Sequence, residues 1–254
     1  MQKIHILTDK KLERIIARRI EENKTRLNIE LQREVMNNQM SLASLQSQIN
    51  PHFLYNALEG IRGQALLDNA PVIVDIAQAL ANYFRYSISS KSDIATLQEE
   101  LSNVNNYLKI QQFRFNNRFI IEINYDKEDR DILDVTLPKL TLQPIIENAI
   151  CHGFEKKIGQ AKINIDIEAT KRSVNITISD NGMGMDEKTL YELNKSIVNY
   201  DVSQSPIGRH NGIAMPNINR RLQLMFGEEY GIHISSIKDI GTDVDLHIPF
   251  CIKG

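Results

Sequence analysis

The apolar residues of this chain follow two different periods, and the change between them near residue 116 limits the folds that the chain can adopt. Before it, apolar side chains recur every three or four residues, as on one face of a helix. After it, they alternate with polar side chains, as in strands with one buried face. The sequence therefore predicts an α+β protein with helices first and then an α/β sandwich, a sheet with helices on one face. The predicted strands are 119–126, 162–169, 174–180, 231–237 and 243–250, and the predicted helices between them are 138–152, 186–198 and 216–226.

The N-terminal residues carry the seam of a coiled coil. From Leu31 to Ile49 the seam positions advance in alternating steps of four and three, with the polar Asn38 among them. An extra step of four between Leu27 and Val35 has the form of a stutter. Pairing of this helix with a second copy is favoured, since nothing downstream in the N-terminal half is suited to cover so long a seam. A single amphipathic helix packed on its own domain remains the alternative.

Two further apolar helical faces follow, over residues 53–61 and 73–84, with turn residues between them at 68–71. They predict a helical hairpin, and two hairpins from two chains would close a four-helix bundle. His52 directly follows Pro51 at the start of this hairpin. An imidazole is a good nucleophile near neutral pH, although a lone histidine on a helix is more often a surface or capping residue.

Composition excludes several classes of protein. The net charge of −2 offers no broad cationic field, so nucleic acid is not the expected partner. No apolar run reaches the roughly 18 residues that span a bilayer, and the polar N-terminus does not resemble a signal peptide, so the chain as given is expected to be cytoplasmic. The two cysteines, Cys151 and Cys251, lack metal-ligand spacing and are expected to be reduced thiols.

Three segments of the second half hold residue types suited to a Mg-nucleotide. Asn148 falls in the predicted helix that ends at His152, where its amide oxygen is a suitable ligand for Mg²⁺. Asp180 ends a predicted strand before two glycines, and its carboxylate suits the exocyclic amine of adenine. An ordinary turn is the equally weighted alternative for Asp180 and those glycines, because Asp-Asn-Gly favours turns in any protein. A further glycine stands before a helix whose amides could hold phosphate oxygens, near an asparagine. The two glycines after Asp180 are Gly182 and Gly184, and the glycine and asparagine at the phosphate-holding helix are Gly212 and Asn217. His152 and Gly153 are expected to form a helix end that borders the nucleotide.

The motifs occur in an order that resembles a known family. QINPHFLYNALEGI, ANYFRYSIS, TLQEELSNVNNYLKIQQFRF, LPKLTLQPIIENAICHGF, DNGMGM and GTDVDLHIPF together resemble the LytS-type sensor histidine kinases, in which a phosphoacceptor region precedes a GHKL-type ATPase domain. The resemblance covers roughly residues 41–250. It implies a signalling coiled-coil helix over 1–45, dimerisation and histidine phosphotransfer helices over 46–116, and an ATP-binding catalytic domain over 117–254.

The same resemblance implies roles for individual residues. His52 would be the phosphoacceptor, Asn148 would bind Mg²⁺, and Asp180 would read adenine with help from Thr242. The glycines Gly182, Gly184 and Gly212 and the side chain of Asn217 would shape the site. ATP and Mg²⁺ are the implied cofactors.

The implied protein is a homodimeric sensor kinase of a two-component system. It would phosphorylate itself and then the aspartate of a response regulator receiver domain, with membrane-spanning segments upstream of Met1. Two alternatives remain: a GHKL-type ATPase without histidine transfer, and a degenerate kinase that acts as a dimeric scaffold. The support for the scaffold is three departures from the family pattern, Cys151 in place of a frequent lysine, Ala214 in place of a glycine and Pro216 in place of a basic residue.

Overall fold

The computed structural model describes residues 51–88, 92–115, 118–126, 128–154, 160–198 and 214–252. The chain divides into two units, Met1–Leu54 and Tyr55–Gly254. Of the first unit only residues 51–54 are described, and they form the first turn of helix α2 (Pro51–Leu67). The predicted coiled coil of residues 1–45 therefore lies outside the described residues.

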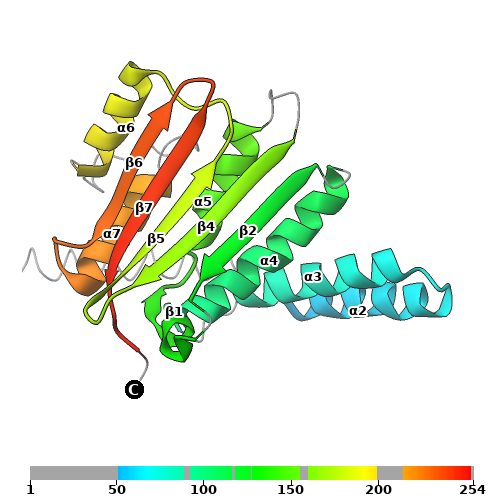
Figure 1. Ribbon diagram of the computed structural model, residues 1–254. Helices are drawn as coiled ribbons and strands as arrows, with labels where there is room; N and C mark the ends of the chain where they lie inside the picture. The colour runs from blue at the N-terminus through cyan, green and yellow to red at the C-terminus, as the bar shows by residue number, and fades with distance from the viewer. Residues whose placement is uncertain are drawn as a thin grey trace, which may run out of the picture. The chain divides into compact units, whose positions relative to one another are not determined.

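Helix α3 (Pro71–Ile88) follows α2 after a turn at residues 68–70. A proline at the first position suits both helices, because its fixed φ is helical and its missing N–H would have no partner there. In the turn, Asn69 adopts a left-handed φ of 52°, and the N–H of Ala70 donates to the carbonyl of Ala65 at 2.9 Å. Figure 1 shows the two helices side by side, as an antiparallel pair.

This helix pair buries only part of its apolar surface. Leu58 and Ala65 of α2 and three alanines of α3 are buried, whereas larger side chains stay exposed in the single chain. The predicted apolar face thus includes Ile61, 51% exposed, and Ile73, 48% exposed. The other large apolar side chains of the pair that are exposed within the second unit are Leu66, Leu67 and Val72.

Helix α4 (Leu97–Arg114) is preceded by the short strand β1 (Ile94–Thr96), which pairs antiparallel with β3 (Thr136–Pro138). The hydroxyl of Thr96 accepts from the N–H of Glu99, and the Glu99 carboxylate accepts from the N–H of Thr96, which is a capping box. The sequence did not predict β1 and β3, because three residues are too few to show an alternating pattern.

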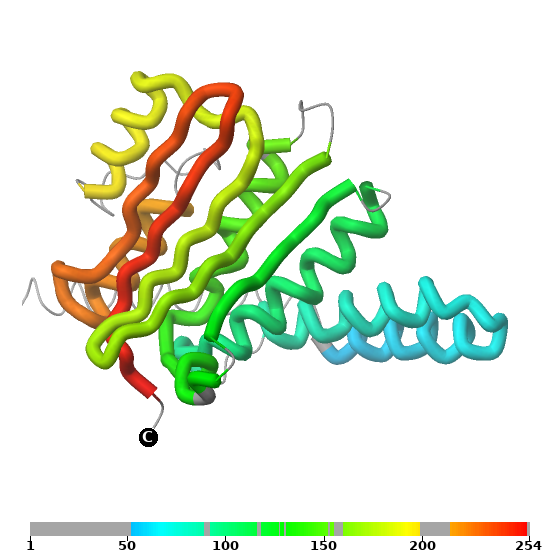
Figure 2. The backbone as a smooth tube through the Cα atoms, viewed as in Figure 1, coloured from blue at the N-terminus to red at the C-terminus, as the bar shows by residue number. Residues whose placement is uncertain are grey.

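The main sheet has five strands in the order β2-β4-β5-β7-β6. Strands β2 and β4 are parallel and the other neighbours are antiparallel, and the strands run side by side in Figure 2. Each strand agrees with its predicted range to within two residues at either end. Their bounds are β2 Phe119–Tyr125, β4 Ala161–Ala169, β5 Ser173–Asp180, β6 Gly231–Ile237 and β7 Gly241–Pro249.

The sheet buries one face, as the alternation predicts. On β4, Ile163 and Ile165 are fully buried, whereas Asn164 between them points to the other face. Helices α4, α5 (Leu142–Asn148) and α7 (Ala214–Phe226) lie behind the sheet in Figure 1, and α6 (Glu187–Val198) packs beside β6. The predicted arrangement of helices on one face of this sheet is therefore confirmed, while the two-stranded sheet of β1 and β3 is additional.

The helix predicted over 138–152 is shorter in the structure. Leu140 has a left-handed φ of 58°, which no α-helix accommodates, so α5 begins only at Leu142. After Asn148 the chain forms a π-helical turn, η2 (Ala149–Gly153). The remaining described element is a 3₁₀ turn, η1 (Arg130–Asp134). Within the described residues no helix is both long and apolar enough to cross a membrane.

Candidate functional site

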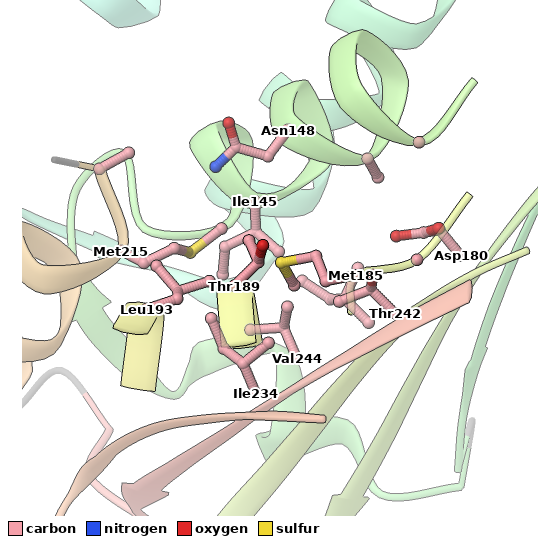
Figure 3. Close-up of a pocket in the computed structure, with 15 residues that line it drawn as sticks. Ile145, Asn148, Asp180, Met185, Thr189, Leu193, Met215, Ile234, Thr242 and Val244 are labelled. Carbon is pink, nitrogen blue, oxygen red and sulfur yellow. The ribbon is translucent and has the colours of Figure 1, made fainter. Parts of the chain in front are cut away.

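A cavity of about 310 Å³ lies in the second unit, between the buried face of the sheet and the helices α5, α6 and α7. Figure 3 shows the side chains that surround it. Asn148 projects from α5 on one side, and Asp180 lies at the end of β5. The residues around the cavity are Ile145, Asn148, Ala149, Gly153, Ile178, Asp180, Gly184, Met185, Thr189, Leu193, Ala214, Met215, Ile234, Thr242 and Val244.

Most of this lining is apolar. The sheet contributes Ile178, Ile234 and Val244, and two methionines close the space from the loop after β5 and from the start of α7, as Figure 3 shows. Methionine side chains are flexible and polarisable, so they adapt well to flat rings. An apolar cavity of this size with few polar groups at its edge suits the aromatic part of a small ligand.

Asp180 lines the cavity, and its carboxylate is held by its own loop. Its Oδ1 accepts the N–H of Gly182 at 2.7 Å. A Cβ at Gly182 would stand 2.5 Å from both that oxygen and the Cα of Gly153, and the N–H of Met183 donates to the carbonyl of Gly153 at 3.0 Å. The end of β5 and the turn η2 therefore touch through two glycines, and larger residues would separate them.

Gly184 has a different reason to be glycine. Its φ is 59°, and a Cβ there would run into the carbonyl oxygen of Ile237, the last residue of β6. Both glycines contact other parts of the same chain closely, so they shape the loop that carries Asp180. Gly184 also lines the cavity, and its role toward a nucleotide stays a prediction.

Thr242 lies directly opposite Asp180 in the pairing of β5 with β7. Its hydroxyl is 3.0 Å from that of Ser236, and Ser236 Oγ accepts the N–H of Met185 at 2.9 Å. Thr242 thus joins a chain of hydrogen bonds that fixes the loop after Asp180.

Five of the predicted site residues line this one cavity: Asn148, Gly153, Asp180, Gly184 and Thr242. Gly182 packs against two of them. His152 lies in η2, while Asn217 is exposed on α7 and is not among the described residues that line the cavity. Gly212 lies outside the described residues, and His52 is an exposed residue of α2 in the first unit.

The sequence did not point to Thr189, Leu193 and Met215, which line the cavity from α6 and α7. Nothing in their local pattern separates them from ordinary core residues of an amphipathic helix. Of the three positions that depart from the family pattern, Ala214 lines the cavity, Pro216 is buried in α7 and Cys151 is exposed on η2.

Comparisons with known proteins find two families in the same order as the two halves of the chain. The family described as histidine kinase matches residues 40–119. The family described as histidine kinase-, DNA gyrase B- and HSP90-like ATPase matches residues 134–252. The second match includes every element that lines the cavity.

Three Bacillus subtilis relatives extend this similarity over most of the chain. The sensor histidine kinase YesM is 38% identical over 219 residues, covering 86% of this chain and 35% of YesM. The sensor protein LytS is 32% identical over 209 residues, covering 82% of this chain and 33% of LytS. The uncharacterized protein YwpD is 35% identical over 212 residues, covering 82% of this chain and 70% of YwpD. The chain spans about a third of the length of YesM and LytS, and by this shared sequence it belongs to the LytS-type sensor histidine kinases.

Proposed function

We propose that this chain is the ATP-binding and phosphoacceptor part of a two-component sensor histidine kinase. It transfers the γ-phosphoryl group of ATP to His52 and then to an aspartate of a response regulator receiver domain. One observation carries the proposal: a largely apolar cavity is lined by both Asp180 and Asn148, in a chain whose preceding segment matches the histidine kinase family.

The cavity fits an adenine nucleotide. Its apolar lining accepts the flat face of the base, and the Asp180 carboxylate is an acceptor for the exocyclic amine. The amide oxygen of Asn148 is a suitable Mg²⁺ ligand, and Mg²⁺, when bound, neutralises phosphate charge and orients the γ-phosphoryl group. His152, Gly153, Gly212 and Asn217 would border the phosphates, and Thr242 would support Asp180.

His52 acts in this proposal as the nucleophile. The unprotonated nitrogen of its neutral imidazole attacks the γ-phosphorus, the bond from that phosphorus to the bridging oxygen breaks, and ADP leaves. The carboxylate of the receiver domain then displaces the imidazole from phosphorus. The exposure of His52 on the first turn of α2 supports both steps, since each partner must reach the ring.

The proposal includes a homodimer. Exposed apolar side chains on α2 and α3, Ile61 and Ile73 among them, would be buried if two hairpins closed a four-helix bundle. The coiled coil of residues 1–45 would continue from this bundle. Since the matched residues make up only 35% of YesM and 33% of LytS, we further propose membrane-spanning segments upstream of this chain in a longer protein.

Labelling with γ-phosphate-labelled ATP and Mg²⁺ tests the function. The label should be labile to acid and stable to base, as a phosphoramidate is. It should be absent from a His52→Gln protein that still binds ATP, and present in the control His233→Gln, since His233 is an exposed residue of β6. Label retained in His52→Gln would remove His52 from its role. ATP hydrolysis without any label would favour the ATPase alternative, and failure to bind ATP would favour the scaffold.

A further inference from the structure

Glu100 is a fully buried carboxylate, with 0% of its surface exposed, on the face of α4 that packs into the core. It accepts three consecutive backbone N–H groups at the start of α5. Its Oε1 accepts from Leu140 at 2.6 Å, and its Oε2 accepts from Thr141 at 2.9 Å and from Leu142 at 2.8 Å. A buried carboxylate is costly unless it is paired, and here backbone donors provide the pairing.

These three N–H groups have no local alternative. The first N–H groups of a helix lack partners within it, and the side chain of Thr141, which precedes α5, does not cap it. The Thr141 hydroxyl donates instead to the carbonyl of Pro138 at 2.5 Å. Leu140, with its left-handed φ of 58°, adds a conformation that a non-glycine residue adopts only under constraint. Glu100 therefore holds a strained turn in place.

The same turn is held from its other side by a positive charge. The guanidinium of Arg221, on α7, donates to the carbonyl of Lys139 and, at 3.5 Å, to that of Leu140. Since α7 also lines the cavity with Ala214 and Met215, the turn connects two walls of the site.

Helix α3 reaches the same carboxylate. The hydroxyl of Tyr86 donates to Glu100 Oε1. Burial and the neighbouring Glu100 carboxylate raise the pKa of Tyr86, so the phenol keeps its proton and remains a donor. The Glu100 carboxylate thus joins α3, α4 and the start of α5 at one point.

We propose that Glu100 is a positioning residue for the nucleotide site. It fixes the first turn of α5, and so the place at which Asn148, the last residue of that helix, meets a bound Mg-nucleotide. Helix α5 has only seven residues and is therefore about 10 Å long, so a tilt at its start reaches Asn148 undiminished. The inference rests on the proposed function, because it assumes that Asn148 takes part in binding the Mg-nucleotide.

The test measures ADP affinity by calorimetry with and without Mg²⁺ in the full chain, so that no catalytic step is needed. Glu100→Gln replaces one acceptor oxygen by an amide and leaves the set of backbone N–H groups one acceptor short. We expect the gain in affinity that Mg²⁺ provides to fall by about fivefold or more. Amide hydrogen exchange at residues 140–142 should become faster without any ligand. The matched control is Glu192→Gln, at an exposed position of α6.

Asn148→Ala distinguishes a failure of the positioning role of Glu100 from a failure of the role proposed for Asn148. If it abolishes the Mg²⁺ gain while Glu100→Gln leaves that gain unchanged, the positioning role is overturned and the proposed function stands. If Asn148→Ala itself has no effect on the Mg²⁺ gain, the role of Asn148 fails and the inference fails with it. A merely structural role for Glu100 would lower stability and leave the Mg²⁺ gain of the folded protein unchanged.

Tyr86→Phe keeps the test decisive if Glu100→Gln does not fold. It preserves the three backbone hydrogen bonds and removes only the fourth donor, so the Mg²⁺ gain should fall in the same direction, by about twofold. Tyr191→Phe, at a position 67% exposed on α6, is its control. A Tyr86→Phe protein with the wild-type Mg²⁺ gain would then overturn the proposal.

Discussion

Replacing Asp180 by asparagine tests the adenine side of the site with little change of shape. In the structure Asp180 Oδ1 accepts the N–H of Gly182 at 2.7 Å. The asparagine of Asp180→Asn keeps an oxygen for that N–H, so the loop through Gly184 should persist. It presents an amide donor where the second carboxylate oxygen stood, and this donor faces the amine of adenine rather than accepting from it.

The size of the effect follows from the loss of one charge-assisted hydrogen bond. Such bonds contribute about 1.5 to 3 kcal/mol, and each 1.4 kcal/mol is a factor of ten in affinity. The Kd for ATP should therefore rise by about tenfold to a hundredfold. The preference for ATP over GTP should also shrink, because guanine carries a carbonyl oxygen at that edge, which the carboxylate repels and an amide can bind.

Calorimetric titration with a non-hydrolysable ATP analogue measures this change. The control is Asp243→Asn, since Asp243 is exposed on β7 and alters the charge of the same sheet without lining the cavity. Circular dichroism and the unfolding midpoint should match those of the wild type. Unchanged affinity for ATP in a folded Asp180→Asn protein would refute the role of Asp180 and, with it, the orientation of the base proposed here.

Three further outcomes are expected. Gly184→Ala should lower the free energy of unfolding, measured in urea, by at least about 1 to 2 kcal/mol, because its φ is 59° and the new Cβ would meet the carbonyl of Ile237. The control Gly60→Ala, in open space on α2, should not lower it. Equal effects of the two substitutions would contradict this reasoning. Above pH 10.0, the ordinary pKa of tyrosine, stability should fall less steeply in Tyr86→Phe than in the wild type, as urea titrations between pH 9 and pH 11 would measure. The reason is that folding raises the pKa of Tyr86. The contribution of Tyr86 to stability is therefore complete below its pKa in the unfolded chain and is lost as the pH rises from that pKa toward its pKa in the folded protein. A protein without residues 1–30 should still be a dimer in light scattering at micromolar concentration. The reason is that the predicted seam from Leu31 to Ile49 and the helix pair would bury on the order of 800 Å² per protomer. A monomer would instead make the deleted coil the principal dimer contact.

Local pattern was sufficient for the main elements. Alternation of apolar and polar residues placed all five strands of the sheet, because each strand buries one face and side chains point to alternate faces. The pattern also placed Asp180 at a strand end, where the structure has it as the last residue of β5. The helix pair was predictable because Pro71 and the turn before it mark the boundary of α3. The coiled coil of residues 1–45 remains a prediction.

Conformations imposed by distant neighbours were not predictable. Leu140 looks like an ordinary helical residue, yet its left-handed φ shortens α5, because Glu100 and Arg221 hold its backbone from two other helices. The short strands β1 and β3 exist only as each other's partners.

Glu100 shows most clearly what the tertiary structure decided. Its position was readable, since it lies three residues after the buried Leu97 and four before the buried Val104, on the core-facing side of α4. Its backbone partners were not, because they lie 40 to 42 residues further along the chain. The sequence by itself determined which segments are helices and strands, since periodicity is a property of each segment alone. Only packing determined the cavity and the contacts of Glu100 and Arg221 with the turn before α5. Both are made by residues from elements that come together only in the folded protein.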